Sequence, residues 1–391
     1  MKIITRRGFN LIYLLAFLLS LADAVAGYTQ SSFLQQYFSL DFVGLIVGLG
    51  TVLTIIVSIF FPKIIAKLSL YVVGLIIVFI NLGSSLILAT TQSTILVVVL
   101  FLVRYLGFIF LLITLDVFLE NISKDNLTGS IRTKYLSAIN LAWLASPILM
   151  GYLVGNNNNY SRVYWFGTTI ICLFLFIFIL NKKQLLAKPI KYQVPKIDFG
   201  QTLKKIISNK DFLAVFCSVI ALNVFYVIAV LYVPLYLNET IGLSWQTLGI
   251  IFTIMLLPFV LIQMPAGWLA DKFIGEKEMM MAGNVIMAGA GVAMWLTTST
   301  SFIFWAAILF LSRIGAALAE AMQEVYFYKK VNASDLGLIN FFRQARNVGW
   351  LIGSLIAFVA LNFLNIPQLF LIVSAILILN TLQLIDLKDT K

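Results

Sequence analysis

Four ionisable side chains stand inside long apolar stretches of the sequence: Asp23, Arg104, Arg313 and Glu320. A charge in such surroundings is costly and is usually kept for function. A carboxyl group there can take up and release a proton, and a nearby guanidinium can compensate its charge. Because the chain has no histidine, proton transfer must use aspartate or glutamate. These residues predict proton coupling, with Asp23 as proton acceptor, Arg104 as its partner and Glu320 as a second carboxylate.

The spacing of these residues indicates which of them can meet. Glu320 lies seven positions after Arg313 and four before Glu324, so the three share one helix face. Asp23 and Arg104 differ in expected membrane depth by about 9 Å, which a long arginine side chain largely bridges. The alternative is a permanent buried pair that fixes helix packing and moves no proton.

The surrounding elements are apolar helices. The chain has 391 residues, of which 61% are hydrophobic and 11% charged, and its mean hydropathy is +1.01. Water-soluble domains contain about 45–50% apolar and about 25% charged residues, and a transmembrane helix needs about 20 apolar residues. We therefore predict an all-α membrane protein with twelve spans, at roughly 8–28, 42–61, 70–90, 94–117, 136–155, 162–181, 212–235, 244–265, 279–298, 302–324, 338–363 and 367–386.

The basic residues lie on alternate connections, and Arg162 alone lies on the opposite set. Positive charge marks cytoplasmic loops, so this distribution predicts cytoplasmic termini and argues against nucleic acid as the partner of a chain with net charge +11. The longest connection divides the chain into an N-terminal six-helix bundle at 1–181, a cytoplasmic linker at 182–211 and a C-terminal six-helix bundle at 212–391.

The two halves repeat each other. Asn140 and Trp143 are echoed by Asn347 and Trp350 after 207 positions, and Arg104 is echoed by Arg313 after 209. Coincident offsets of this kind predict two pseudo-symmetric bundles, as in transporters built from parallel repeats.

A short charged stretch, Gly267-Trp-Leu-Ala-Asp271-Lys272 followed by Gly275 and Lys277, separates two of the apolar runs. It resembles the loop signature of the major facilitator superfamily of transporters, although Glu276 stands where a basic residue is usual. The resemblance implies the fold of that superfamily, a central cavity lined by spans 1, 4, 7 and 10, and alternating access. The first-half copy has Pro62 and Ala66 in place of the glycine and the aspartate.

The resemblance further implies that Asp271 caps a helix of the opposite half, which begins near Arg132. Since Ala66 has no carboxylate, we expect an asymmetric cytoplasmic gate in which other charges substitute. The candidates are Asp116 and Glu120 facing Arg343 and Arg346, and Glu324 holding Lys272 or Arg132. The alternative is that these charges only anchor loops at the lipid headgroups.

Polar and aromatic residues on the expected cavity helices could form a substrate cavity, and aromatic walls with few polar groups suit a moderately apolar organic molecule. The candidates are Tyr13, Ser20, Asn140, Trp143, Asn223, Tyr226, Gln323, Asn347 and Trp350. Packing is the alternative role for the aromatic ones. Ser146-Pro147 and Met150-Gly151 also partly resemble an element of drug–proton antiporters, matching it at Pro147 and Gly151.

The sequence therefore favours a secondary transporter that exports a small organic solute through the cell inner or plasma membrane by proton coupling. Uptake or facilitated diffusion of a sugar, metabolite or peptide is the alternative, and a non-transporting sensor or scaffold on the same fold is a second. Two cysteines without histidine leave no metal site, and we expect no enzyme activity and no cofactor apart from a proton gradient. The expected partners are the solute and the lipid bilayer, with the protein a monomer.

Overall fold

The computed structural model describes residues 2–122, 128–185, 199–262, 265, 275–331 and 335–388, and within these ranges the chain is helical with no strand. The helices pack as two compact units. The first comprises Met1–Tyr37, Val52–Val194 and Ser244–Gly249, and the second comprises Phe38–Thr51, Pro195–Leu243 and Ile250–Lys391. Each unit therefore contains one short segment from the other half of the sequence.

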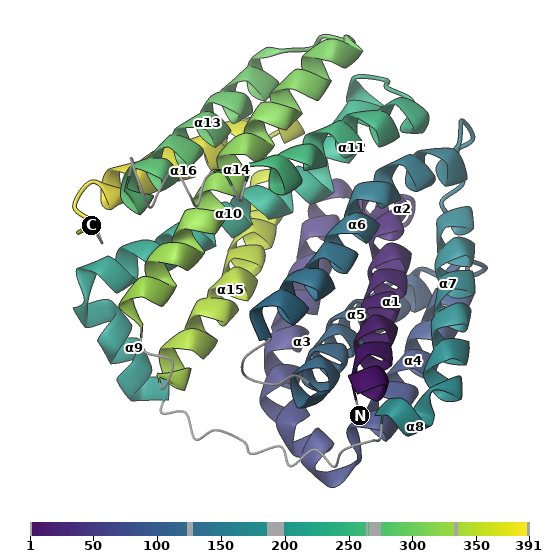
Figure 1. Ribbon diagram of the computed structural model, residues 1–391. Helices are drawn as coiled ribbons and strands as arrows, with labels where there is room; N and C mark the ends of the chain where they lie inside the picture. The colour runs from purple at the N-terminus through teal and green to yellow at the C-terminus, as the bar shows by residue number, and fades with distance from the viewer. Residues whose placement is uncertain are drawn as a thin grey trace. The chain divides into compact units, whose positions relative to one another are not determined.

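The first unit is built mainly from the N-terminal helices (Figure 1). These are α1 (Lys2–Gly27), α2 (Gln30–Gln35), α3 (Leu40–Lys67), α4 (Leu70–Leu88), α5 (Thr94–Ile122), α6 (Thr128–Val154), α7 (Ser161–Leu180) and α8 (Lys182–Leu185). Helix α1 packs against α5, α6 and α7, and α4 packs against α5 and α7. Because α1 lies among three other helices, its C-terminal part is largely buried, and Asp23 lies there.

The second unit contains most of the C-terminal helices (Figure 1). These are α9 (Phe199–Ser208), α10 (Lys210–Leu235), the π-helical turn η2 (Tyr236–Thr240), α11 (Trp245–Leu261), α13 (Glu276–Leu296), α14 (Phe302–Lys330), α15 (Leu336–Ala360) and α16 (Ile366–Leu384). Helix α10 packs against α14, α15 and α16, and α13 packs against α14 and α16.

Side-chain caps fix where several of these helices begin. The Ser69 hydroxyl accepts from the Val72 amide before α4, and the Asn209 amide oxygen accepts from the Asp211 and Phe212 amides before α10. These oxygens satisfy N–H groups that the first turn leaves without a helical partner. The capped starts set which residues of each helix face the core.

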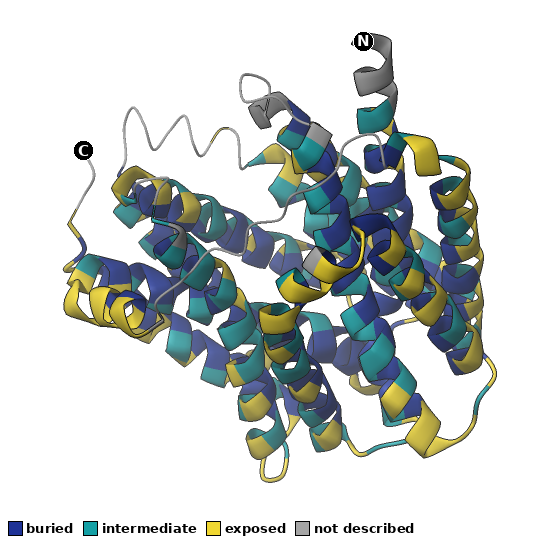
Figure 2. Ribbon diagram, turned by 90° about the horizontal axis from the view of Figure 1, so that it is seen from below, coloured by how far each residue is buried: buried dark blue, intermediate teal, exposed yellow. Residues whose placement is uncertain are grey.

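Many large apolar side chains lie at exposed positions of the helices, as in a protein surrounded by lipid; exposed positions are yellow in Figure 2. Large side chains such as Phe79, Ile95, Ile303 and Leu379 are exposed, and a water-soluble chain rarely exposes so many. Ten helices of the described part of the chain are long and apolar enough to cross a membrane. Helix α11 is apolar but has only 17 residues, and α15 carries Arg343 and Arg346. Multi-pass membrane embedding follows, whereas the count of twelve spans stays a prediction.

Candidate functional site

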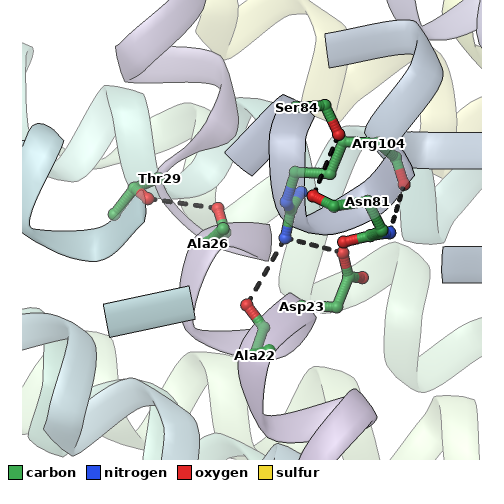
Figure 3. A network of polar contacts seen from close by, with 7 residues as sticks. All are labelled: Ala22, Asp23, Ala26, Thr29, Asn81, Ser84 and Arg104. Carbon is green, nitrogen blue, oxygen red and sulfur yellow. Dashed lines mark hydrogen bonds and ion pairs between the residues drawn. The ribbon is translucent and has the colours of Figure 1, made fainter. Parts of the chain in front are cut away.

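Asp23 and Arg104 meet inside the first unit (Figure 3). The Arg104 Nη2 lies 2.8 Å from the Asp23 Oδ1 and donates a longer bond, 3.4 Å, to the Ala22 carbonyl. Only 7% of the Arg104 side chain and 19% of the Asp23 side chain are exposed. The gap in depth expected from the sequence is thus closed by the long arginine side chain, which runs from α5 to α1.

Neighbouring helices hold the arginine in place. The guanidinium carbon lies 5.7 Å from the centre of the Tyr164 ring on α7, within the range of a cation–π contact. On the other side, the Asn81 side-chain amide on α4 donates to the Arg104 carbonyl at 3.3 Å (Figure 3). Asn81 reaches this position because Gly107, one turn after Arg104, has no side chain: a Cβ there would lie 2.7 Å from the Asn81 Nδ2. The sequence analysis did not identify Asn81, because a single asparagine in an apolar run does not indicate which residue it contacts.

A second charged cluster lies in the other unit, on α10, α14 and α15. The Tyr226 hydroxyl donates to the Glu320 Oε2 at 3.0 Å. Arg346 contacts both acidic residues of the α14 face: its Nη2 lies 2.5 Å from the Glu324 Oε1, and its Nη1 lies 3.7 Å from the Glu320 Oε1. The buried Arg313 places its guanidinium carbon 5.3 and 5.5 Å from the rings of Phe225 and Tyr226. The helix-face spacing therefore brought Glu320 and Glu324 together, with an arginine from α15 between them.

Two of the expected gate carboxylates are paired with arginines of their own unit. Asp116 lies 3.5 Å from Arg132 of α6, its neighbour in the same unit, and Glu324 is bonded to Arg346. The expected gate pairings between the two halves stay predictions. Each of the two observed ion pairs joins two helices of the same unit.

The loop motif lies largely outside the described residues, which exclude Gly267, Asp271 and Lys272. Its last part begins α13: Gly275 is the N-cap, and the Lys277 ammonium donates to the Ile385 carbonyl at 2.5 Å, just after α16. Glu276 is fully buried and is bonded to Lys329 of α14. The acidic residue that departs from the usual motif therefore has a structural partner, Lys329, which could not be identified from the sequence alone.

Most of the other predicted cavity residues make local contacts. Gln323 donates to the Ser218 hydroxyl at 2.8 Å, and Asn223 donates to the Val219 carbonyl at 2.8 Å. Asn347 donates to the Gln344 side chain at 2.8 Å. Their amides are thus engaged within the second unit, and Asn223 also packs where Gly349 leaves room for it.

In the first unit, Trp143 packs edge-on against Tyr28, with ring centres 6.1 Å apart. Asn140 on the same helix is exposed, while Tyr13 and Trp350 are half-buried on α1 and α15. The pairs related by the sequence repeat are therefore equivalent in sequence position but differ in their surroundings.

One contact that the sequence did not reveal joins the start of α11 to the end of α6 and the turn that follows it, all within the first unit. The Trp245 indole donates to the Asn158 Oδ1 at 3.0 Å, and a Cβ on Gly151 would lie 2.6 Å from the Trp245 carbonyl oxygen. Asn158 adopts a positive φ of 50°, which asparagine tolerates better than most residues. Pro147 and Gly151, which partly resemble the antiporter element, thus lie where a second helix approaches closely.

The whole chain shares its fold with solved membrane transporters at low sequence identity. It resembles the nucleoside transporter NupG with 15% identity and a TM-score of 0.71, over 97% of this chain and 98% of that one. It resembles a bacterial homologue of the human lysosomal transporter Spinster, in an inward-facing and unoccupied conformation, with 11% identity and a TM-score of 0.71, over 98% and 95% of the two chains. The peptide transporter POT in complex with sulfate has 12% identity and a TM-score of 0.74, over 97% and 94%.

Sequence agrees with the fold. Residues 214–389 match the family model of the Major Facilitator Superfamily. No curated protein matches the chain in sequence. The resemblance to the Major Facilitator Superfamily is therefore supported by sequence over residues 214–389, and the fold of solved transporters extends over 97% of the chain. The partial likeness of residues 146–151 to drug–proton antiporters stays a prediction.

Proposed function

We propose that this protein is a proton-coupled secondary transporter that exports a small organic solute through the cell inner or plasma membrane by alternating access. The observation that carries the proposal is the buried pair of Asp23 and Arg104, with 2.8 Å between the guanidinium and the carboxylate. An ionisable pair inside a membrane helix bundle is costly to keep and usually serves transport.

The pair supplies a proton site that a solute can control. While Arg104 stays on Asp23, its positive charge favours the ionised carboxylate. If an arriving solute draws the guanidinium away, the carboxylate loses its compensation and takes up a proton, because burial penalises the charged form. Besides the ion pair, the guanidinium contacts only the Ala22 carbonyl at 3.4 Å and the Tyr164 ring among the described residues, so the ion pair is the main interaction that a solute has to replace. Glu320, bonded to Tyr226, is the second carboxylate that can couple proton movement to transport.

The remaining parts of the proposal follow the topology read from the sequence. It includes twelve spans in two six-helix bundles, 1–181 and 212–391, joined by a cytoplasmic linker at 182–211, with both termini in the cytoplasm. Asp271 and the neighbouring charges would close the cytoplasmic side. The direction is export, and uptake, the alternative, is supported by the likeness to transporters of nucleosides and peptides.

The test is transport by the purified full chain in proteoliposomes with an imposed pH gradient, screened against a panel of amines, nucleosides, sugars and short peptides. We expect solute movement against its gradient that stops when an ionophore collapses the pH gradient, and movement of protons in the opposite direction. Asp23→Asn and Glu320→Gln should each impair that proton flux. Solute-driven proton flux that survives in both variants would refute the coupling, and co-movement of protons and solute would replace export by uptake.

A further inference from the structure

Glu320 is a carboxylate with one oxygen engaged and the other open. Its Oε2 accepts the Tyr226 hydroxyl at 3.0 Å. Its Oε1 has Arg346 at 3.7 Å, beyond hydrogen-bonding distance, and makes no hydrogen bond among the described residues. Arg346 is drawn instead to Glu324, at 2.5 Å. Arg346 therefore lies between two carboxylates and is closer to Glu324 than to Glu320.

The cluster is reachable by water even though α14 is a membrane-spanning helix. The side chains of Glu320, Arg346 and Glu324 are 25%, 44% and 48% exposed. Charges exposed in a membrane segment face a water-filled space and avoid lipid. A solute in such a space can therefore approach the open oxygen of Glu320.

Aromatic rings surround the tyrosine that is bonded to Glu320. Tyr226, which orients Glu320, has its ring centre 6.4 Å from that of Phe259 on α11, and both side chains are half-buried. The charge of Arg313 is buried and lies against the rings of Phe225 and Tyr226. An incoming molecule therefore meets aromatic surface next to a carboxylate.

From this arrangement, and resting on the proposed transport function, we propose that Glu320 is the binding site for an organic ammonium ion with an apolar body. The ammonium donates to the Oε1 of Glu320, and the apolar body packs against Tyr226 and Phe259. An aromatic face also attracts a cation directly. The Tyr226 hydroxyl holds the carboxylate in the orientation that receives the ammonium.

A cation suits this cluster better than an anion does. An anion approaching Arg346 would meet Glu320 and Glu324 on either side of it, and like charges at close range are unfavourable. A cation approaching the open oxygen has to compete with Arg346 only at 3.7 Å, because the closer contact of that arginine is with Glu324.

Binding and protonation then compete for one oxygen atom. A protonated Glu320 releases its proton when the ammonium binds, so one positive charge replaces another and the exchange is electrically balanced. The charged and titratable groups that face Glu320 are Tyr226, Arg313, Glu324 and Arg346. Among these, Arg346 competes with the ligand, and Glu324 holds that arginine away.

The experiment uses three probes of similar size and different charge: phenethylammonium, phenethyl alcohol and phenylacetate. Each is titrated calorimetrically into the purified full chain in detergent. We expect the ammonium to bind more tightly than the alcohol and the carboxylate not to bind, with about one proton released per cation when Glu320 starts protonated. Glu320→Gln should weaken ammonium binding about tenfold or more, the effect of losing a charge-assisted hydrogen bond.

Two further variants sharpen the test. Arg346→Gln removes the competitor and should tighten ammonium binding, whereas a site for anions would lose affinity. Glu278→Gln is the matched control, because Glu278 is exposed on α13, and it should leave binding unchanged. If Glu320→Gln does not fold, the Arg346→Gln result decides: tighter binding supports the proposal and weaker binding overturns it.

The remaining outcomes separate this proposal from the transport function. Phenylacetate binding as tightly as the ammonium, or ammonium binding that persists in a folded Glu320→Gln variant, would overturn the site while leaving proton-coupled transport through Asp23 intact. Ammonium binding that depends on Glu320, in a protein that moves no protons in proteoliposomes, would support the site and refute the proposed coupling.

Discussion

Removing the charge of Asp23 should destabilise the protein strongly, because Arg104 would then be buried without its counterion. Asn is close to Asp in shape, so Asp23→Asn tests charge and leaves no cavity. At 2.8 Å between Nη2 and Oδ1, Coulomb's law with an effective dielectric constant of about 20 gives an attraction of about 6 kcal/mol. The desolvation of both groups offsets much of this attraction, so the net worth of the pair is smaller.

The loss of stability on breaking the pair depends mainly on the free energy of leaving Arg104 buried without a counterion. Removing one partner of a buried ion pair typically costs about 3–5 kcal/mol. Arg104 would keep its bond to the Ala22 carbonyl and its contact with the Tyr164 ring, so we expect a value near the lower end, about 3 kcal/mol. Arg104→Gln should cost less, because the Asp23 carboxyl left without its partner can take up a proton, whereas a guanidinium stays charged.

The assay is reversible unfolding of the detergent-solubilised protein in a double-mutant cycle. In Asp23→Asn/Arg104→Gln no charge is left unpaired, so the double variant should be less destabilised than the sum of the single ones by about 1–3 kcal/mol. Asp386→Asn, at an exposed position after α16, is the control and should change stability by less than about 0.5 kcal/mol. Additive effects of the two single substitutions would show that the ion pair contributes nothing, and the reasoning from burial would be wrong.

Two other predictions concern helix docking. Asp335 caps α15 and is bonded to Lys205 of α9. The bond to Lys205 holds the pKa of the Asp335 carboxyl below its usual value; burial opposes this shift, and the hydrogen bond from the Leu338 amide adds to it. Because the pKa is lowered in the folded state, docking of α9 should persist from neutral pH down through the ordinary carboxyl range and weaken only below it. Hydrogen exchange in residues 199–208 measures this, and weakening already near pH 6 would contradict it. Separately, Gly151→Ala should destabilise by about 1–3 kcal/mol through collision with a neighbouring carbonyl, whereas Gly83→Ala, which meets nothing within 4 Å, should be neutral or slightly stabilising in the same unfolding assay.

The sequence predicted the fold class because membrane helices follow from local composition. Apolar runs of about 20 residues define helices whatever their neighbours are, and the charged loop motif indicated the superfamily whose model matches residues 214–389. The approach of Asp23 and Arg104 was also predictable, since helix rise gives the depth of each residue and an arginine covers the difference.

The sequence did not predict which charged residues at the helix ends form ion pairs. Asp116 pairs with Arg132, and Glu324 with Arg346, whereas the sequence offered several basic residues at similar depth. Which of them lies nearest depends on helix rotation and on the path of the connecting loops. Hydropathy does not determine either of these.

Contacts made through backbone shape were also missed. The bond from Trp245 to Asn158 depends on the positive φ of Asn158, and the packing at Gly151 depends on the backbone of another helix. The sequence identified Gly151 as a bending or packing residue. That it makes room for the Trp245 carbonyl oxygen could be seen only in the structure.

The two halves of the chain have an arginine at equivalent positions, but Asp23 and Glu320 lie at positions that are not equivalent. Arg104 and Arg313 occupy equivalent positions and each lies near aromatic rings, but Arg104 is bonded to an aspartate of another helix, whereas Glu320 lies on the same helix as Arg313. The same neutralising substitution should therefore act differently in the two halves. Asp23→Asn leaves a buried guanidinium uncompensated. Glu320→Gln leaves Arg346 still bonded to Glu324, so it should impair ligand binding while costing much less stability.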